Sequence, residues 1–234
     1  MDLAKANNDR WLKVSINPNK LNAFANAARR LTDPTAVARY KSVEAKTGVP
    51  WWFIAVVHER EASQKWNTQL GQGDPLNRKS IHVPKGRGPF NTWEEGAIDA
   101  LVNCAPYAAR QKDWSIGAAL AMLEKYNGLG YANKGRPSPY IWAGTNQYVS
   151  GKYVADGKYD PNAVDTQLGC AGLLKAMKVF DGQIGAEHGA AGGAVVAGAA
   201  AASQYPHLAI YIIAGAVVIA IGAFILIKYL RKGK

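Results

Sequence analysis

Two carboxylates close an apolar segment in the first third of the chain. In Phe53–Glu61, FIAVVHERE, five apolar residues are followed by His58, Glu59, Arg60 and Glu61. On an α-helix, Glu59 and Glu61 would lie about 200° apart and could not both face one cleft. We therefore expect one of them to do chemistry. We expect the other to face solvent or to pair with one of three arginines, Arg60, Arg78 or Arg87.

A carboxyl group at the end of a buried helix is suited to acid catalysis. Partial removal from water raises its pKa and keeps a proton available near neutral pH. Cleavage of a glycosidic bond needs such an acid, which protonates the leaving oxygen while an oxocarbenium-like transition state develops. The segment therefore predicts a general acid, and glycoside cleavage is the reaction that this acid would serve.

The elements that must hold this helix in place are predicted to be mainly α-helical. Helix starts are marked by Asp33 before Pro34 and by Thr92 with Glu95, a capping-box pair. The predicted helices cover residues 17–31, 33–48, 49–61, 92–104, 113–127 and 164–180. Residues 67–89 are rich in Gly, Pro, Asn and Asp, which predicts a long loop or small hairpin.

Composition limits the partners. The 28 Lys and Arg against 17 Asp and Glu give a net charge of +11 (28 − 17), which favours an anionic partner such as anionic lipid or a cell-wall polymer. The basic residues are scattered rather than clustered on one helix, so nucleic-acid binding is not expected. Cys104 and Cys170 either pair or remain two core thiols. No metal site and no cofactor are implied, since the sequence has neither CxxC nor a His cluster.

The C-terminal region predicts a membrane anchor. Residues 208–227 are uncharged and apolar over about the 20 residues that span a bilayer, and KYLRKGK follows them. By the positive-inside tendency, the tail is cytoplasmic and the large N-terminal part lies outside the cytoplasm. The expected location is thus an inner membrane, with the catalytic domain periplasmic, or alternatively a virion membrane. The N-terminus shows no apolar core of signal-peptide length.

These observations divide the chain into five predicted parts. They are an N-terminal extension (1–19), a catalytic domain (20–184), a Gly/Ala-rich linker (185–206), a transmembrane helix (207–229) and a basic tail (230–234). The linker could instead be a second, weakly hydrophobic membrane-active segment.

Several motifs in fixed order resemble one family. FIAVVHERE, WNTQLGQGDPLN, VPKGRGPF, TWEEGAIDAL, YNGLGY, RPSPYIWAGTNQY and DPNAVDTQLGCAGLLKAM are similar to bacterial and prophage lysozyme-family, endolysin-like proteins. The resemblance spans residues 30–178, outside the predicted anchor. It implies a lysozyme-like helical fold and cleavage of peptidoglycan.

The resemblance also implies site residues. In the lysozyme superfamily the general acid directly follows a His at the end of an apolar helix, which points to Glu59, with Glu61 as the alternative. His58 would then orient the site or belong to the core. Lysozyme-like folds place a second carboxylate in the loop after the acid helix, which points to Asp74. Glu94 and Glu95 are weaker candidates for that group.

The remaining candidates concern substrate binding. A Tyr-Asn-Gly turn borders the sugar cleft in similar proteins and corresponds to Tyr126, Asn127 and Gly128. Tyr131, flanked by Gly and Ala in YNGLGYAN, is the other aromatic expected at the cleft, and His58 is counted with this group.

The predicted function is membrane-anchored cleavage of the MurNAc-GlcNAc backbone of peptidoglycan, in phage-type lysis or wall remodelling. One alternative is a lytic transglycosylase, which closes muramic acid onto itself and manages with one Glu. The others are a non-catalytic wall-binding or virion structural protein and a membrane-disrupting protein.

Overall fold

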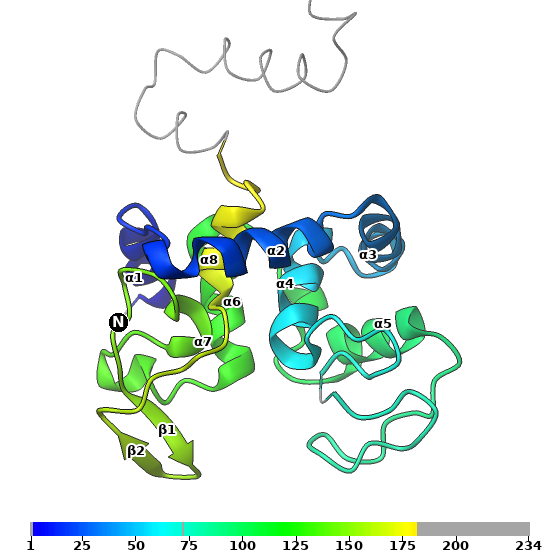
Figure 1. Cartoon of the computed structure of the whole chain (residues 1–234). Coiled ribbons are helices and arrows are strands. Elements are labelled where there is room, and N and C mark those ends of the chain that lie inside the picture. The colour runs from blue at the N-terminus through cyan, green and yellow to red at the C-terminus, as the bar shows by residue number, and fades with distance from the viewer. Residues whose placement is uncertain (1, 72, 182–234) are drawn as a thin grey trace, which may run out of the picture. The chain divides into compact units, whose positions relative to one another are not determined.

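Helix α4 (Trp51–Ala62) is the central element of the fold. The computed structural model describes residues 2–71 and 73–181. Phe53, Ile54, Ala55, Val56 and Val57 of α4 have no exposed surface. Helices α8 (Cys170–Ala176) and α2 (Leu21–Leu31) pack against α4 and against each other, and α2 crosses over both (Figure 1). An apolar helix is stable here because its neighbours cover it on most sides.

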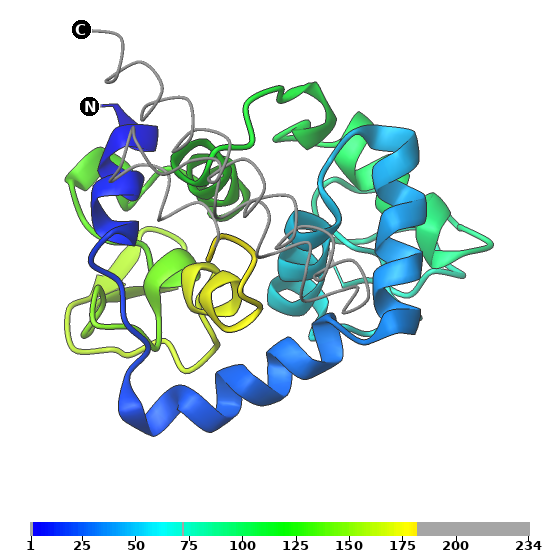
Figure 2. The ribbon, with the colours of Figure 1, turned by 90° about the horizontal axis from the view of Figure 1, so that it is seen from above.

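Helices α3 (Pro34–Thr47) and α5 (Trp93–Asn103) lie on one side of α4 (Figure 2). Asp33 caps α3 by accepting hydrogen bonds from the backbone N–H groups of Thr35 and Ala36, and Gly48 ends α3 in the left-handed region, at φ 72°. These contacts satisfy end groups that a helix cannot satisfy itself.

The other side holds α1 (Leu3–Trp11), α6 (Ile116–Asn127), the short α7 (Pro139–Trp142) and a two-stranded antiparallel sheet. Strands β1 (Lys152–Ala155) and β2 (Lys158–Asp160) pair Lys152 with Asp160 and Tyr153 with Tyr159. Short 3₁₀ helices span Pro18–Lys20, Ala108–Arg110 and Ala132–Lys134.

The structure confirms a mainly helical domain and alters its boundaries. The stretch predicted as an N-terminal extension instead forms α1, which packs on α6 within the compact unit Met1–Val179. Of the helix predicted over 164–180, only α8 is helical. Residues 164–169 precede it without helical structure, and residues 177–180 form turns. The small hairpin lies at β1 and β2, whereas residues 67–89 form a long loop.

The membrane prediction concerns residues that the structure does not describe. Among the described residues, no helix is long and apolar enough to cross a bilayer. The predicted linker, transmembrane helix and basic tail all lie outside them. Cys104 and Cys170 are described, and both are buried free thiols rather than a disulfide.

The packing of α2 on α8 depends on a glycine. A Cβ atom added at Gly172 would overlap the ring of Phe24, a fully buried side chain of α2. The absence of a side chain at this position therefore sets how closely the two helices approach.

Gly172→Ala is expected to lower the free energy of unfolding by about 1–3 kcal/mol, because overpacking forces the helices apart. Urea unfolding of residues 1–181, followed by far-UV circular dichroism, measures this loss. In a Phe24→Leu background the same substitution should cost less, since the shorter side chain leaves room. Equal costs in both backgrounds would contradict this account of the packing.

Candidate active site

The four polar residues near the C-terminal end of α4, His58 to Glu61, have four different surroundings. His58 has no exposed surface and lies among the rings of Tyr40, Trp66 and Trp93. Its Nε2 lies 3.0 Å from the carbonyl oxygen of Lys65, to which it donates, and its Nδ1 accepts from the Tyr40 hydroxyl at 3.1 Å. Burial lowers the pKa of His58 to about 4. His58 is thus a neutral core residue, which was one of the two expected roles, and with no exposed surface it does not join the substrate-binding group.

Glu59 is held by an arginine of α2. Both of its carboxylate oxygens accept hydrogen bonds from Arg30 Nη2, at 2.8 and 3.0 Å. Arg30 and Arg39 line an open cavity of about 560 Å³ on this side of the molecule, together with Trp66. The expectation that one glutamate would pair with an arginine is met, but the partner is Arg30 rather than Arg60, Arg78 or Arg87.

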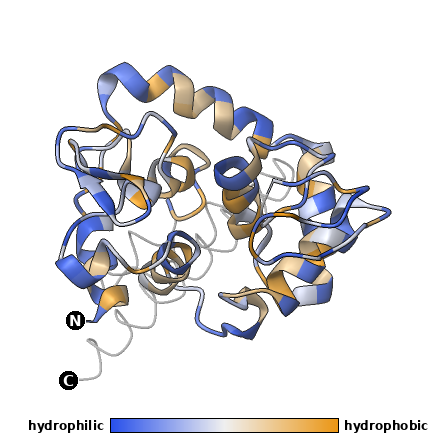
Figure 3. Cartoon of the chain, turned by 90° about the horizontal axis from the view of Figure 1, so that it is seen from below, coloured by the Kyte–Doolittle hydropathy of each residue, from blue (hydrophilic) through white to orange (hydrophobic). Residues whose placement is uncertain are grey.

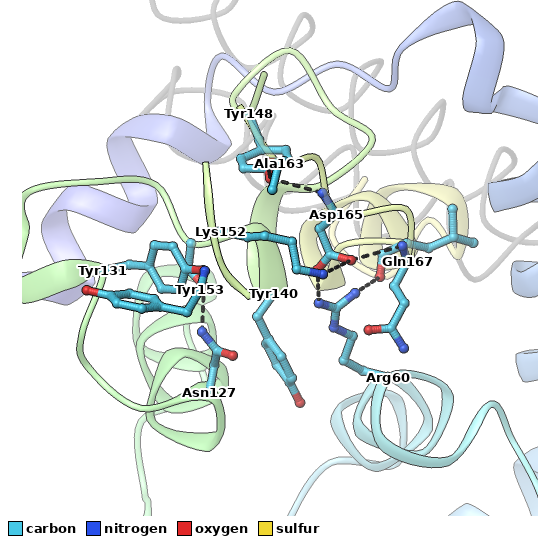
Figure 4. Close-up of polar contacts among 12 residues, drawn as sticks. Arg60, Asn127, Tyr131, Tyr140, Tyr148, Lys152, Tyr153, Ala163, Asp165 and Gln167 are labelled. Carbon is cyan, nitrogen blue, oxygen red and sulfur yellow. Dashed lines mark hydrogen bonds and ion pairs between the residues drawn. The ribbon is translucent and has the colours of Figure 1, made fainter. Parts of the chain in front are cut away.

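Arg60 forms a buried ion pair with Asp165. Its Nη2 lies 2.6 Å from Asp165 Oδ2, and the side chains are only 5% and 7% exposed. Lys152 Nζ approaches the other oxygen of Asp165 at 3.6 Å (Figure 4). Burial alone would raise the pKa of Asp165, but Arg60 and Lys152 outweigh it and lower the pKa, so Asp165 is a carboxylate at neutral pH.

Glu61 has different surroundings from Glu59. It is partly exposed, and its Oε1 accepts a hydrogen bond of 2.7 Å from the Tyr140 hydroxyl of α7. Burial raises the pKa of Glu61, and the Tyr140 hydrogen bond and the charge of Arg60 offset this rise only in part. Nearby, the Tyr126 hydroxyl is buried and has no hydrogen-bond partner among the described residues, and its pKa is raised by burial and by the charge of Glu61.

A polar cavity of about 520 Å³ lies near this end of α4, and neither Glu61 nor Tyr140 belongs to its wall. Arg60, which follows Glu59 on α4, and Pro139, which precedes Tyr140, both belong to its wall. The wall also contains Asn127, Tyr131, Lys152, Tyr153, Ala155, Asp156, Gly157, Asp165 and Gln167, most of which Figure 4 labels. A cavity of this size can hold a sugar-sized ligand.

Two of the predicted substrate-binding residues therefore meet at one cavity. Asn127 lies at the end of α6 and donates to Ser138 at 3.1 Å, and the Tyr131 hydroxyl accepts from the backbone N–H of Tyr153 at 2.8 Å. Tyr126 lies behind the wall, next to Glu61, rather than on the wall itself. Gly128 caps α6 at φ 79° and is exposed, which gives it a role in the turn.

Asp74 organises the loop that follows α4. Its Oδ2 accepts from the backbone N–H groups of Ile81 and His82 at 3.0 and 3.1 Å, and its Oδ1 lies 2.8 Å from His82 Nδ1. Burial would raise its pKa, but these hydrogen bonds prevail and the pKa of Asp74 is lowered. Because both oxygens are engaged within the loop, the geometry does not support Asp74 as the second catalytic group.

The weaker candidates are engaged as well. Glu94 binds Arg39 at 2.6 and 3.1 Å, and Glu95 accepts from the backbone N–H of Asn91 at the start of α5. Arg87 pairs with Asp99.

The sequence patterns missed the residues that build the wall. Arg60, Lys152 and Asp165 come from three separate segments, and although Arg60 and Asp165 lie within quoted motifs, none of the three was expected to line a site. The one available signal was a lone charge in a stretch otherwise free of it: Asp165, in NAVDTQLGCAGLL, is the only charged residue between Asp160 and Lys175.

A second carboxyl group has a raised pKa. Burial raises the pKa of Glu124 on α6 to about 7, and its Oε1 has no hydrogen-bond partner among the described residues. Glu124 is only 2% exposed and borders a cavity of about 30 Å³. That volume admits water but no sugar ring, so Glu124 is not a candidate for contact with a glycan.

Comparisons of this chain with protein-family models, curated proteins and solved structures found no match. Within the described part of the chain, no group of three or more His, Cys, Asp or Glu side chains could hold a metal ion.

Asp165→Asn is expected to lower the free energy of unfolding by about 3 kcal/mol at pH 7, because it leaves Arg60 buried without its counter-charge. The pKa of Asp165 is lower in the folded chain than in the unfolded one. Its stabilisation is therefore complete above the unfolded pKa of about 3.9 and is lost as the pH falls through the folded pKa.

The difference between wild type and Asp165→Asn should accordingly shrink below pH 4. Urea unfolding at a series of pH values measures it. Asp156→Asn, at an exposed position in the turn between β1 and β2, is the matched control and should cost little at any pH. A loss for Asp165→Asn that stays constant down to pH 2 would contradict the ion-pair interpretation.

Proposed function

We propose that this chain cleaves the glycan strands of peptidoglycan, with Glu61 as the general acid. The observation that carries the proposal is the state of Glu61, which is partly exposed, has a raised pKa and has a neutral hydroxyl as its hydrogen-bond partner, while its chain neighbour Arg60 lines a polar cavity. Glycosidic bond cleavage requires a carboxyl group that keeps its proton near neutral pH and can reach the leaving oxygen.

The choice of Glu61 over Glu59 follows from their partners. A carboxyl group whose two oxygens both accept hydrogen bonds from an arginine is already engaged and is poorly placed to donate a proton to a substrate. Glu59 has such a partner in Arg30, whereas Glu61 has Tyr140. Glu59, the first candidate from the sequence, therefore takes the structural role, and Glu61 takes the catalytic one.

In the proposed reaction a glycan strand lies along the cavity wall. Asn127 and the tyrosine pair Tyr131 and Tyr153, whose ring centroids are 5.2 Å apart, are in reach of a sugar. Glu61 donates its proton to the glycosidic oxygen as the bond to the anomeric carbon breaks. Tyr140 holds the carboxyl group in position and stabilises the carboxylate that remains.

A lytic transglycosylase reaction is the second candidate, and the state of the aspartates favours it. Asp74 is hydrogen-bonded within its loop, and the Asp165 carboxylate is ion-paired with Arg60 and Lys152. Neither is free to act as a nucleophile or to activate water. A reaction in which the muramic acid hydroxyl attacks its own anomeric carbon needs no such group beyond Glu61.

The lysozyme-like fold and membrane attachment through residues 207–229 remain part of the proposal. The resemblance of residues 30–178 supports the fold, and the apolar composition and basic flank of the C-terminal region support the attachment. The proposed location is an inner membrane with this domain in the periplasm, or a virion membrane.

Glu61→Gln is expected to reduce glycan cleavage on the order of 10²–10⁴-fold, because the amide cannot donate a proton. Glu59→Gln should retain most of the activity and lose mainly stability. The measurement is mass spectrometry of fragments released from purified peptidoglycan. Reducing MurNAc ends indicate a muramidase, and anhydro-muramic ends indicate a transglycosylase.

Two results would overturn the assignment. Loss of activity with Glu59→Gln alone, in a folded protein, would return the acid role to Glu59. Wild-type protein that binds peptidoglycan and releases nothing would favour the non-catalytic wall-binding alternative.

Tyr140→Phe is expected to raise the pKa of Glu61 further, because the carboxylate loses its hydrogen-bond donor. Activity falls as the pH rises through the pKa of the acid, so this alkaline limb of kcat/KM should move to higher pH. A pH profile of fragment release measures the shift. Tyr126→Phe is the control, since its hydroxyl has no hydrogen-bond partner in the described structure, and an unmoved limb in Tyr140→Phe would exclude Glu61 as the titrating group.

A further inference from the structure

The loop that follows α4 presents two aliphatic side chains to solvent. We call residues 75–90 the basic loop; it projects at the right edge of the molecule in the views from above and below (Figures 2 and 3). Ile81 is 70% exposed and Val83 is 82% exposed. Two large apolar side chains this exposed, two residues apart at a projecting tip, suit contact with an apolar partner.

The tip is held in shape by hydrogen bonds beneath it. Ser80 exchanges backbone hydrogen bonds with Arg87 and Gly86, at 2.8 and 2.9 Å, and its hydroxyl donates to the Pro84 carbonyl at 2.7 Å. Asp74 accepts from the backbone N–H groups of Ile81 and His82. These bonds use the polar groups of the turn internally and leave the apolar side chains outside.

The charge around the tip has one sign. The basic loop carries Arg78, Lys79, Lys85 and Arg87, and residues 75–93 contain no Asp or Glu. Arg87 is paired with Asp99 of α5, whereas Arg78, Lys79 and Lys85 are exposed. Apolar side chains flanked by exposed cations match the order of a bilayer surface, with acyl chains beneath anionic headgroups.

We infer that the tip of the basic loop docks on an anionic lipid bilayer, with Ile81 and Val83 entering the interface and Arg78, Lys79 and Lys85 binding headgroup phosphates. A wall polymer offers anionic groups too, but its sugars would favour aromatic side chains over exposed aliphatic ones. The inference does not depend on Glu61 or on glycan cleavage. It adds a membrane contact within the folded domain, separate from the predicted C-terminal anchor.

The test uses the full chain reconstituted in vesicles, with an environment-sensitive fluorophore attached to a cysteine at the tip, Val83→Cys. Val149→Cys is the matched control, because Val149 is 84% exposed and has no charged residue within two positions. Cys104 and Cys170 are buried, and the wild-type chain shows whether they take up label. Nitroxide-labelled lipids quench a probe that enters the bilayer.

In vesicles containing phosphatidylglycerol, the probe at position 83 should shift to the blue and be quenched, while the probe at 149 should not. Replacing Arg78, Lys79 and Lys85 by Gln should lower the quenched fraction, since each cation strengthens binding about fivefold. Vesicles of pure phosphatidylcholine should likewise give a lower quenched fraction for the probe at position 83.

Three outcomes would overturn the inference. The first is equal quenching at 83 and 149, which indicates general adsorption. The second is a response at 83 to peptidoglycan fragments but not to anionic vesicles, which assigns the tip to the wall. The third is no response to either.

Discussion

Helix α4 is enclosed on nearly every side, and this enclosure decides what each polar side chain at its end can do. Successive residues of a helix turn about 100°, so the four residues from His58 to Glu61 meet four different neighbours. His58 enters an aromatic core, Glu59 meets α2, Arg60 meets the segment before α8, and Glu61 meets α7. One short stretch thereby joins both sides of the domain and supplies the candidate acid.

The two glutamates show how surroundings divide chemistry between identical side chains. Both oxygens of Glu59 accept hydrogen bonds from a guanidinium, whereas Glu61 has a phenol as its partner, and burial raises the pKa of Glu61 more than the phenol lowers it. On the wall of the nearby cavity, Asp165 is kept ionised by Arg60 and Lys152. A carboxyl group with a raised pKa near one with a lowered pKa is the arrangement in which acid and charge-stabilising roles separate.

Local signals predicted the elements that local interactions stabilise. Asp33 and Gly48 mark the ends of α3 because capping involves residues a few positions apart. That the two glutamates would meet different surroundings was likewise predictable, and their partners differ. The choice between Glu59 and Glu61 was not, because Arg30 and Tyr140 lie 29 and 79 residues away along the chain. Asp74 misled for a related reason: its partners are in the same loop, and nothing in GQGDP distinguishes a turn-forming carboxylate from a reactive one.

The two thiols lie in the interior of the domain, which limits their reactivity. Cys170 is fully buried and Cys104 nearly so, burial raises the pKa of both thiols, and no disulfide joins them. Thiolate is the form that reacts with oxidants, so both groups are poorly reactive at neutral pH. Both thiols therefore belong to the packed interior of the described domain in their reduced form, and oxidation of either one would require the core to open locally.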